Sequence, residues 1–219
     1  MLYLRYILLL IVLLSHFSIA HGNEENLNDD FSFFDDTTVS HSTPYDPLMG
    51  FNRVMTHFND WTYVTIMRSI GQGYRTITPE FFRLGSYHFF QNILFPVRFV
   101  NNILQFKFEA AGTEVARFCI NSTVGVLGIM DLADRWFHLY PQKEDFGQTL
   151  GAWGIGAGPF LVLPFYGPTT LRDMFGLVGD FASNPISYVT PDEHRYVLQG
   201  VHGLTDFTYK IDTIDEIRK

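Results

Sequence analysis

The side chains that enzymes use for covalent or acid–base chemistry are present in this 219-residue sequence, but none stands at a catalytic spacing. There is no Gly-x-Ser-x-Gly turn for a serine nucleophile, no His-Glu-x-x-His pair for zinc, and no Cys-x-x-Cys pair. The eight histidines are scattered, and none lies three or four residues from another His or from Cys. We therefore predict that the protein is not an enzyme and holds no metal or cofactor.

Two short patterns that resemble sites have simpler explanations. Asp131 and Asp134 are close enough to share a helix face, but such carboxylates more often cap a helix or pair with a neighbour such as Arg135. Asn121-Ser-Thr matches the glycosylation acceptor pattern, which is short enough to occur often by chance. Neither pattern supports catalysis.

The only cysteine, Cys119, stands between Phe118 and Ile120. These apolar neighbours predict a buried and unreactive thiol. A disulfide within the chain is excluded because Cys119 has no partner.

The net charge of −8 is concentrated near the N-terminus. Residues 21–46 carry seven acids and no Lys or Arg, so that residues 47–219 are nearly neutral, with 14 bases and 16 acids. Because no basic stripe is present, nucleic-acid binding is excluded. The 22 Phe and 11 Tyr indicate either a large aromatic core or a surface that meets lipid.

The first twenty residues resemble a signal peptide. Arg5 precedes eight aliphatic residues, Ile7–Leu14, and Ser18-Ile-Ala20 provides the small residues that signal peptidase requires, with cleavage predicted after Ala20. The alternative is an uncleaved anchor over residues 2–20. No cysteine follows the apolar run, so we expect no lipid at the N-terminus. Residues 21–45 are acidic and aperiodic, which predicts a flexible tether.

Helix start signals recur after residue 45. Asp46-Pro47 pairs a good N-cap with a residue suited to the first helical turn, and Thr78-Pro79-Glu80 repeats this signal. Apolar spacing predicts further helices from Pro96 through Phe108 and over Glu109–Val124. Strand signals are scarce, so we predict an all-α fold. None of these helices has the roughly 20 apolar residues of a membrane span, which favours helices lying within one leaflet over a crowded soluble bundle.

Residues 146–172 form a segment rich in Gly and Pro. Pro159, Pro164 and Pro168 forbid a long helix there, and the glycines permit sharp bends and close backbone approach. A phosphate-binding loop is excluded because no Gly-Lys-Ser/Thr follows. We predict an apolar hairpin loop packed against helices, closed by an ion pair between Arg172 and Asp173.

The last helix is predicted over residues 192–218 and is amphipathic. One stripe is formed by six apolar residues: Val197, Val201, Leu204, Phe207, Ile211 and Ile214. We expect this stripe to dock on the rest of the protein.

Several long motifs, in order over about residues 46–173, carry a family resemblance. They are DPLMGFNR from Asp46, FN at Phe58, VNNILQ from Val100, RF at Arg117, NSTVG from Asn121, EDFGQTLG from Glu144, GIGAGP from Gly154, LP at Leu163, GP at Gly167 and LRD from Leu171. In these motifs the chain resembles the MlaA (VacJ) family.

The resemblance implies a ring-like bundle of short helices embedded in the inner leaflet of the Gram-negative outer membrane, often held against a trimeric porin. It implies an amphipathic channel that removes mislocalised phospholipid and passes it to a periplasmic carrier (MlaC), with no bond made or broken. It further implies a hairpin beside the channel and an N-terminal helix motif that controls it. The hairpin residues are Phe146, Leu150, Trp153, Gly154, Gly156, Gly158, Phe160, Leu161, Arg172 and Asp173, and the helix motif comprises Phe51, Asn52, Arg53, Phe58 and Asn59.

Four parts are thus expected: the signal peptide (1–20), the tether (21–45), a membrane-embedded domain (46–190) and a C-terminal helix (191–219). The sequence departs from the family in lacking the lipidated cysteine and in stopping at Lys219, which weakens the expectation of carrier docking. Two alternatives remain: a porin-associated scaffold without transport, and, less favoured, a phospholipase.

Overall fold

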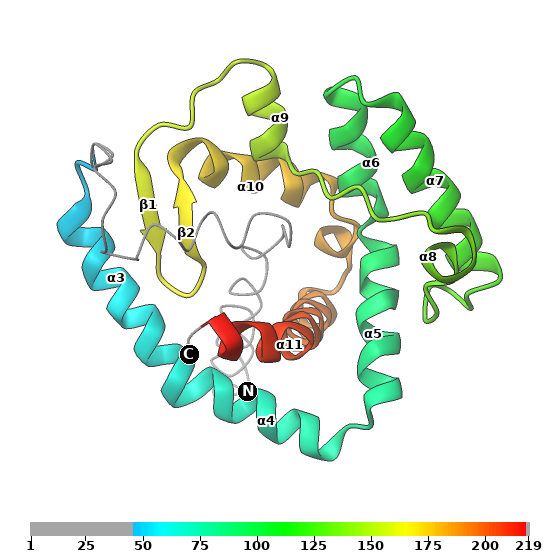
Figure 1. The fold of residues 1–219 in the computed structure, drawn as a ribbon, viewed down its shortest axis with the longest axis horizontal. Helices are drawn as coiled ribbons and strands as arrows, with labels where there is room; N and C mark the ends of the chain where they lie inside the picture. The colour runs from blue at the N-terminus through cyan, green and yellow to red at the C-terminus, as the bar shows by residue number, and fades with distance from the viewer. Residues whose placement is uncertain (1–45, 218–219) are drawn as a thin grey trace.

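A computed structural model describes residues 46–217, so the predicted signal peptide, its cleavage site at Ala20 and the predicted tether lie outside the described residues. Short helices follow one another around a ring, which a two-stranded hairpin completes (Figure 1). The first arc is one curved rod made of α3 (Met49–Thr62), a π-helical turn η3 (Tyr63–Met67) and α4 (Arg68–Ile77). Thr78 is extended, as expected for the residue before proline, and this ends the rod.

The other elements complete the ring and cross its inside. They are α5 (Glu80–Ile93), α6 (Phe95–Leu104), α7 (Phe108–Thr123), α8 (Leu132–Phe137), α9 (Phe146–Ala152), β1 (Phe160–Leu163), β2 (Gly167–Thr170), α10 (Leu171–Ser183), the 3-10 turn η4 (Pro185–Tyr188) and α11 (Asp192–Ile217). The contacts run from α6 to α9 and α10, from α10 to β2, and from β1 back to α3. Helix α11 lies within the ring and packs against α4 and α5 (Figure 1).

The all-α prediction is confirmed, with one small hairpin added, and two helix boundaries differ from the expectation. The predicted helix from Pro96 to Phe108 ends at Leu104 because Phe106 adopts a left-handed conformation (φ 60°) that turns the chain into α7. Helix α3 begins at Met49, after Asp46 Oδ1 has accepted a hydrogen bond from the Leu48 N–H (2.9 Å).

An apolar cluster lies where α11 meets the curved rod. Tyr63 and Met67 pack there with Phe207 and Ile211, all four of them almost fully buried. Docking through this part of the predicted stripe is therefore confirmed.

The prediction that the stripe on α11 is buried is wrong for its first half. Val197 and Val201 are exposed, whereas Gly200 and Gly203 are buried. Small residues allow a helix to approach its neighbour closely, so the contact face there is chosen by size rather than by hydropathy.

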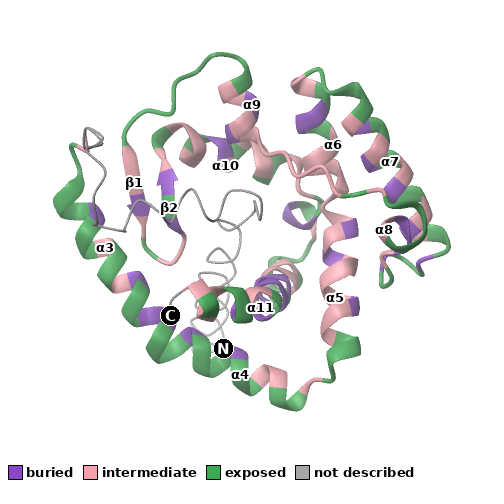
Figure 2. Ribbon diagram, viewed as in Figure 1, coloured by how far each residue is buried: buried purple, intermediate pink, exposed green. Residues whose placement is uncertain are grey.

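Burial in this protein runs opposite to the usual arrangement. Among the described residues, sixteen polar or charged residues are buried but only ten apolar ones are. Many large apolar side chains are exposed instead, and Figure 2 shows exposed stretches along most helices of the ring. Such a pattern is unfavourable in water because exposed apolar area is not removed from solvent.

Candidate functional site

The hairpin expected beside the channel is a pair of antiparallel strands. The register runs from Phe160 opposite Thr170 to Leu163 opposite Gly167. The three-residue turn between the strands places Phe165 (φ 63°) and Gly167 (φ 101°) in the left-handed region. A search for two-residue Asn-Gly or Asp-Gly turns therefore misses it.

Asn52 on α3 holds the outer edge of strand β1. Its Oδ1 accepts a hydrogen bond from the Val162 N–H (2.8 Å), and its Nδ2 donates to the Phe160 carbonyl (3.1 Å). The same Nδ2 lies 3.0 Å from both carboxylate oxygens of Asp46, which fixes the orientation of the amide. The side-chain amide thus pairs with the strand as a peptide of a neighbouring strand would.

Asn59 repeats this arrangement two helical turns later. Its Oδ1 accepts from the Phe165 N–H (2.8 Å) and its Nδ2 donates to the Leu163 carbonyl (2.9 Å). We call Asn52 and Asn59 the asparagine clamp. Together they attach the hairpin to α3 and set its position along that helix.

The residues of the N-terminal helix motif differ in burial. Asn52 and Asn59 are buried against the hairpin, and Phe58 packs edge-on against Phe165 with ring centroids 5.1 Å apart. Phe51 and Arg53 are exposed.

The residues predicted for the hairpin segment are gathered at one side of the ring, but on four different elements. Phe146 and Leu150 lie on α9, Phe160 and Leu161 lie on β1, Arg172 and Asp173 lie in the first turn of α10, and Trp153, Gly154, Gly156 and Gly158 form the exposed loop between α9 and β1.

The exposed loop over residues 153–159 is anchored at both ends. Trp153 Nε1 donates to the Leu104 carbonyl (3.0 Å), and the Arg172 N–H donates to the Ala157 carbonyl (3.0 Å). Gly154 (φ 86°) and Gly158 (φ 73°) require the left-handed conformation, whereas no atom approaches a Cβ built at Gly156. Gly156 is thus the position at which this loop can be altered without a steric clash.

Arg172 and Asp173 form the predicted local ion pair, with Nε 2.8 Å from Oδ1. The other carboxylate oxygen of Asp173 accepts a hydrogen bond from the Thr170 hydroxyl (2.7 Å), and that hydroxyl caps α10. The pair lies over the glycines of α9, since a Cβ at Gly147 would meet Asp173 and one at Gly151 would meet Arg172. These two positions therefore require glycine because a larger side chain would clash with the ion pair, not because the backbone needs glycine's flexibility.

Helices α9 and α10 approach each other through glycine. A Cβ at Gly176 would lie 2.5 Å from the backbone nitrogen of Gly147, and one at Gly179 would lie 2.3 Å from the Phe146 ring. This close contact brings the Phe146 N–H within 2.9 Å of Asp180 Oδ1. The same oxygen accepts from Asn101 Nδ2 (3.1 Å), so that Asp180 joins α6, α9 and α10.

The buried carboxyl of Asp180 makes the stability of the folded protein depend on pH. Burial raises the pKa of its carboxyl from 3.8 to about 6, although the hydrogen bonds from Phe146 and Asn101 lower it. A carboxyl with a raised folded-state pKa stabilises the fold below pH 4, and this contribution is lost as the pH rises through 6.

Asp180→Asn is therefore expected to stabilise the protein at pH 7.5, by at most about 3 kcal/mol, and to have little effect at pH 4. Oδ1 of asparagine retains both hydrogen bonds. Urea unfolding of both proteins at several pH values checks this, and a difference that does not vary with pH would contradict it.

Helix α7 presents a charged face to α6 and to the segment that follows α7 in the chain. Glu114, fully buried, pairs with Arg98 at 2.8 Å and accepts from the Gln142 N–H at 2.6 Å. Arg117 pairs with Asp131 at 2.7 Å and also donates to the Leu139 carbonyl. These bonds connect α7 to α6 and to the chain after it.

Asp131 caps α8, as one of the two simpler explanations predicts, but it pairs with Arg117 and not with Arg135. Burial alone would raise the pKa of Asp131, but hydrogen bonds from Asn121 and Arg117 together with the charge of Arg117 lower it. Asn121 is itself buried, with its amide bonded to Asp131 and to the Ala133 N–H. The Asn121 side chain therefore has a structural role, which accounts for the asparagine of the glycosylation pattern.

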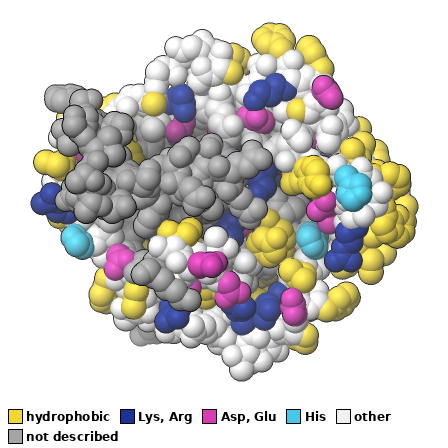
Figure 3. Space-filling view, viewed as in Figure 1, with side chains coloured by type: hydrophobic (Ala, Val, Ile, Leu, Met, Phe, Trp, Pro, Cys, Tyr) yellow, Lys and Arg dark blue, Asp and Glu magenta, His cyan; other side chains and the backbone are white. Residues whose placement is uncertain are grey.

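The prediction for Cys119 is wrong, because the thiol is exposed. It lies on the outer face of α7 beside Phe118, opposite the charged face. Apolar neighbours mark the outside of this helix rather than its inside. Figure 3 shows hydrophobic side chains gathered at the edge of the molecule over α7, α8 and their connection.

The described residues provide an apolar perimeter around a polar interior. No helix between residues 46 and 217 is long and apolar enough to cross a membrane. Within the same range, no three His, Cys, Asp or Glu side chains are grouped so that they could hold a metal ion. The arrangement suits contact with lipid at the perimeter and with polar groups inside.

Comparison with known proteins identifies relatives in several bacteria. The chain is 34% identical over 163 residues to uncharacterized protein RP093 of Rickettsia prowazekii, covering 74% of this chain and 64% of the relative. It is 36% identical over 161 residues to the intermembrane phospholipid transport system lipoprotein MlaA of Escherichia coli K12, covering 71% of this chain. The match spans 64% of the length of that relative.

A solved structure described as "Structural basis for maintenance of bacterial outer membrane lipid asymmetry" superposes with a TM-score of 0.65 at 31% identity, covering 80% of this chain and 88% of that one. The model of the family described as MlaA lipoprotein matches residues 44–219, a stretch that includes the hairpin, the asparagine clamp and α11. On these matches, the chain belongs to the MlaA lipoprotein family.

Proposed function

We propose that this protein transports phospholipid at the outer membrane of a Gram-negative bacterium. It lies in the periplasmic leaflet and removes mislocalised phospholipid from the outer leaflet through an amphipathic channel within the ring. It passes the lipid to a periplasmic carrier of the MlaC type, and a trimeric porin holds it in place. The observation that carries this proposal is the reversed burial, with many polar side chains buried and many large apolar ones exposed among the described residues.

The reversed burial supports a position in lipid for a simple reason. A single leaflet removes exposed apolar side chains from water without requiring a membrane-spanning helix. The amphipathic interior would admit a charged head group together with its acyl chains. The E. coli relative, named an intermembrane phospholipid transport system lipoprotein, supports the same function, and so does a relative of the same name in Haemophilus influenzae that is 34% identical over 142 residues.

The test is surface-exposed phospholipid in a Gram-negative strain that lacks its own family member, with and without this protein. Transport predicts that exposure returns to the normal level. If exposure stays high while the protein is found in the outer membrane, the porin-associated scaffold is favoured instead. Released fatty acid or lysolipid would indicate a phospholipase.

Gly156→Pro is expected to impair lipid transfer without loss of folded protein. Proline stiffens the loop between α9 and β1, and no neighbouring atom lies within 4 Å of a Cβ at this position. The measurement is surface-exposed phospholipid at matched protein levels. Gly112→Ala on α7, also free of neighbours, is the control for a glycine outside the loop. Full transfer by the Gly156 variant would show that the loop plays no part in gating.

Cys119 reports directly on the membrane position. A membrane-impermeant, charged maleimide is expected to label it readily in detergent-free denaturant but at least about tenfold more slowly in outer-membrane vesicles, because the outer face of α7 would lie in lipid. A lipid-soluble maleimide is expected to label it in both. Fast labelling by the charged reagent in vesicles would contradict embedding of this face.

A further inference from the structure

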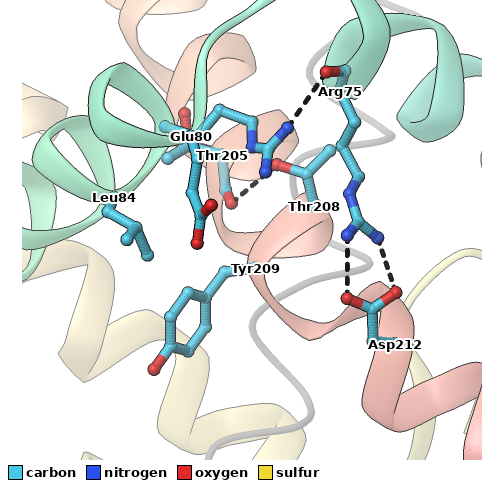
Figure 4. A pocket seen from close by; sticks show the side chains of 8 residues that line it. Arg75, Glu80, Leu84, Thr205, Thr208, Tyr209 and Asp212 are labelled. Carbon is cyan, nitrogen blue, oxygen red and sulfur yellow. Dashed lines mark hydrogen bonds and ion pairs between the residues drawn. The ribbon is translucent and has the colours of Figure 1, made fainter.

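A small polar pocket lies where the turn between α4 and α5 meets α11. Its volume is about 150 Å³, and its lining comes from all three helices: Arg75, Glu80, Arg83, Leu84, Thr205, Thr208, Tyr209 and Asp212 (Figure 4). Thr205 and Thr208 form a buried floor, whereas Glu80, Tyr209 and Asp212 are exposed at the rim. The pocket is therefore open on one side.

The charges in the pocket are balanced but not all mutually paired. Arg75 and Asp212 form a bidentate ion pair, with nitrogen–oxygen distances of 2.6 and 2.8 Å. This pair uses both terminal nitrogens of Arg75 and both oxygens of Asp212, so that it closes one wall of the pocket. Arg83 and Glu80 provide the remaining positive and negative charges.

Among the described residues, the side chain of Arg83 is bonded through one of its three nitrogens. Its Nη1 donates to the carbonyls of Arg75 (3.0 Å) and Thr78 (3.3 Å). Within residues 46–217, its Nε and Nη2 have no acceptor, and the Glu80 carboxylate likewise has no hydrogen bond or ion pair. A fixed guanidinium with two nitrogens left to donate suits an anionic oxygen group such as a phosphodiester.

The other side of the pocket suits a cation. Glu80 provides a carboxylate that is unpaired within residues 46–217, and beside it at the rim lies the ring of Tyr209, one face of which stacks on Tyr87 with ring centroids 3.9 Å apart. The hydroxyls of Thr205 and Thr208 donate to α11 carbonyls at 2.7 and 2.9 Å, so their remaining capacity is to accept hydrogen bonds. Carboxylate, aromatic face and hydroxyl acceptors together are the groups that bind an ammonium.

The surroundings of the pocket are apolar and protruding. Ile77, Phe81 and Phe82 flank Glu80 at the turn between α4 and α5 and are 81%, 71% and 59% exposed. A head group in the pocket would thus have acyl-chain contacts next to it. A free phosphate or amine has no acyl chain and would not contact these residues.

We infer that the pocket between the α4–α5 turn and α11 binds the zwitterionic head group of a phospholipid, with the phosphodiester on Arg83 and the ammonium on Glu80. The inference rests on the proposed function, since it names the lipid class that the protein prefers. Ethanolamine phospholipids fit it, whereas a glycerol head group lacks the cation that Glu80 would bind.

Soluble deacylated lipids test the pocket directly. With the full chain in detergent micelles, calorimetry is expected to detect glycerophosphoethanolamine, with glycerophosphoglycerol, inorganic phosphate and ethanolamine each binding at least about tenfold more weakly. Glu80→Gln is expected to weaken glycerophosphoethanolamine about tenfold and to leave glycerophosphoglycerol unchanged. Because Glu80 makes no bond within the described chain, this variant should fold normally.

Two controls complete the experiment. Glu109→Gln removes a matched exposed acid from the first turn of α7 and should change nothing. Arg83→Lys keeps the charge but loses the planar donors, and should weaken both deacylated lipids. Equal binding of the two deacylated lipids by the wild type, or unchanged binding by Glu80→Gln, would overturn the inference. Failure of the proposed function is distinguishable, because it would leave surface-exposed phospholipid high whether or not the pocket binds.

Discussion

Asn59→Ala is expected to release the hairpin from α3 and to destabilise the protein by about 2–4 kcal/mol. The substitution removes both bonds of one half of the asparagine clamp and leaves the Leu163 carbonyl and the Phe165 N–H without partners on that side. The loss exceeds that of an ordinary surface bond because two backbone groups are left unpaired at once. Urea unfolding measures the stability, and hydrogen exchange over residues 160–166 reports whether the hairpin has opened.

His57→Ala is the matched control for Asn59→Ala, since His57 is exposed on the same helix and two residues away. Asn59→Asp refines the result, because it keeps the acceptor for Phe165 but places a charged oxygen against the Leu163 carbonyl. We expect it to be as harmful as alanine at neutral pH. Unchanged exchange in the hairpin of Asn59→Ala would mean that pairing with β2 alone positions strand β1.

Gly176→Ala is expected to cost about 3 kcal/mol or more, which is large for the addition of one methyl group. The new Cβ would lie 2.5 Å from the nitrogen and 2.7 Å from the Cα of Gly147, so a backbone and not a side chain would have to move. Moving α9 away from α10 also breaks the hydrogen bond from Phe146 to Asp180. Thermal and urea unfolding measure the loss.

Gly112→Ala provides the comparison for Gly176→Ala, because no atom lies within 4 Å of a Cβ at that helical position. It should stabilise the protein by up to about 1 kcal/mol through the better helix propensity of alanine. If Gly176→Ala behaved in the same way, the contact between α9 and α10 would have to be looser than the structure indicates.

Both predictions concern attachments of the same segment. The asparagine clamp fastens one edge of the hairpin, and the glycine contact fastens α9, from which the exposed loop departs. A loop that gates lipid must move while its two ends stay in place. Loss of either attachment is therefore expected to disturb transfer through the position of the loop and not only through stability.

Local signals in the sequence determined most of the helices and one feature of the site. Proline and capping residues placed α5 and α6 within a residue of their observed starts, and adjacent opposite charges predicted the ion pair of Arg172 with Asp173. These features depend on neighbours in the chain, so local chemistry is sufficient for them. The ordered motifs likewise sufficed for the family.

Only the tertiary structure decided which face of each helix is buried. Cys119, Val197 and Val201 were expected to be buried on hydropathy but are exposed, because their helices bury polar, charged or small residues instead. The clamp was equally hidden, since Asn52 and its partner Val162 are separated by 110 residues. A sequence pattern shows that a helix has two faces, but which of them is turned inward depends on elements that only folding brings together.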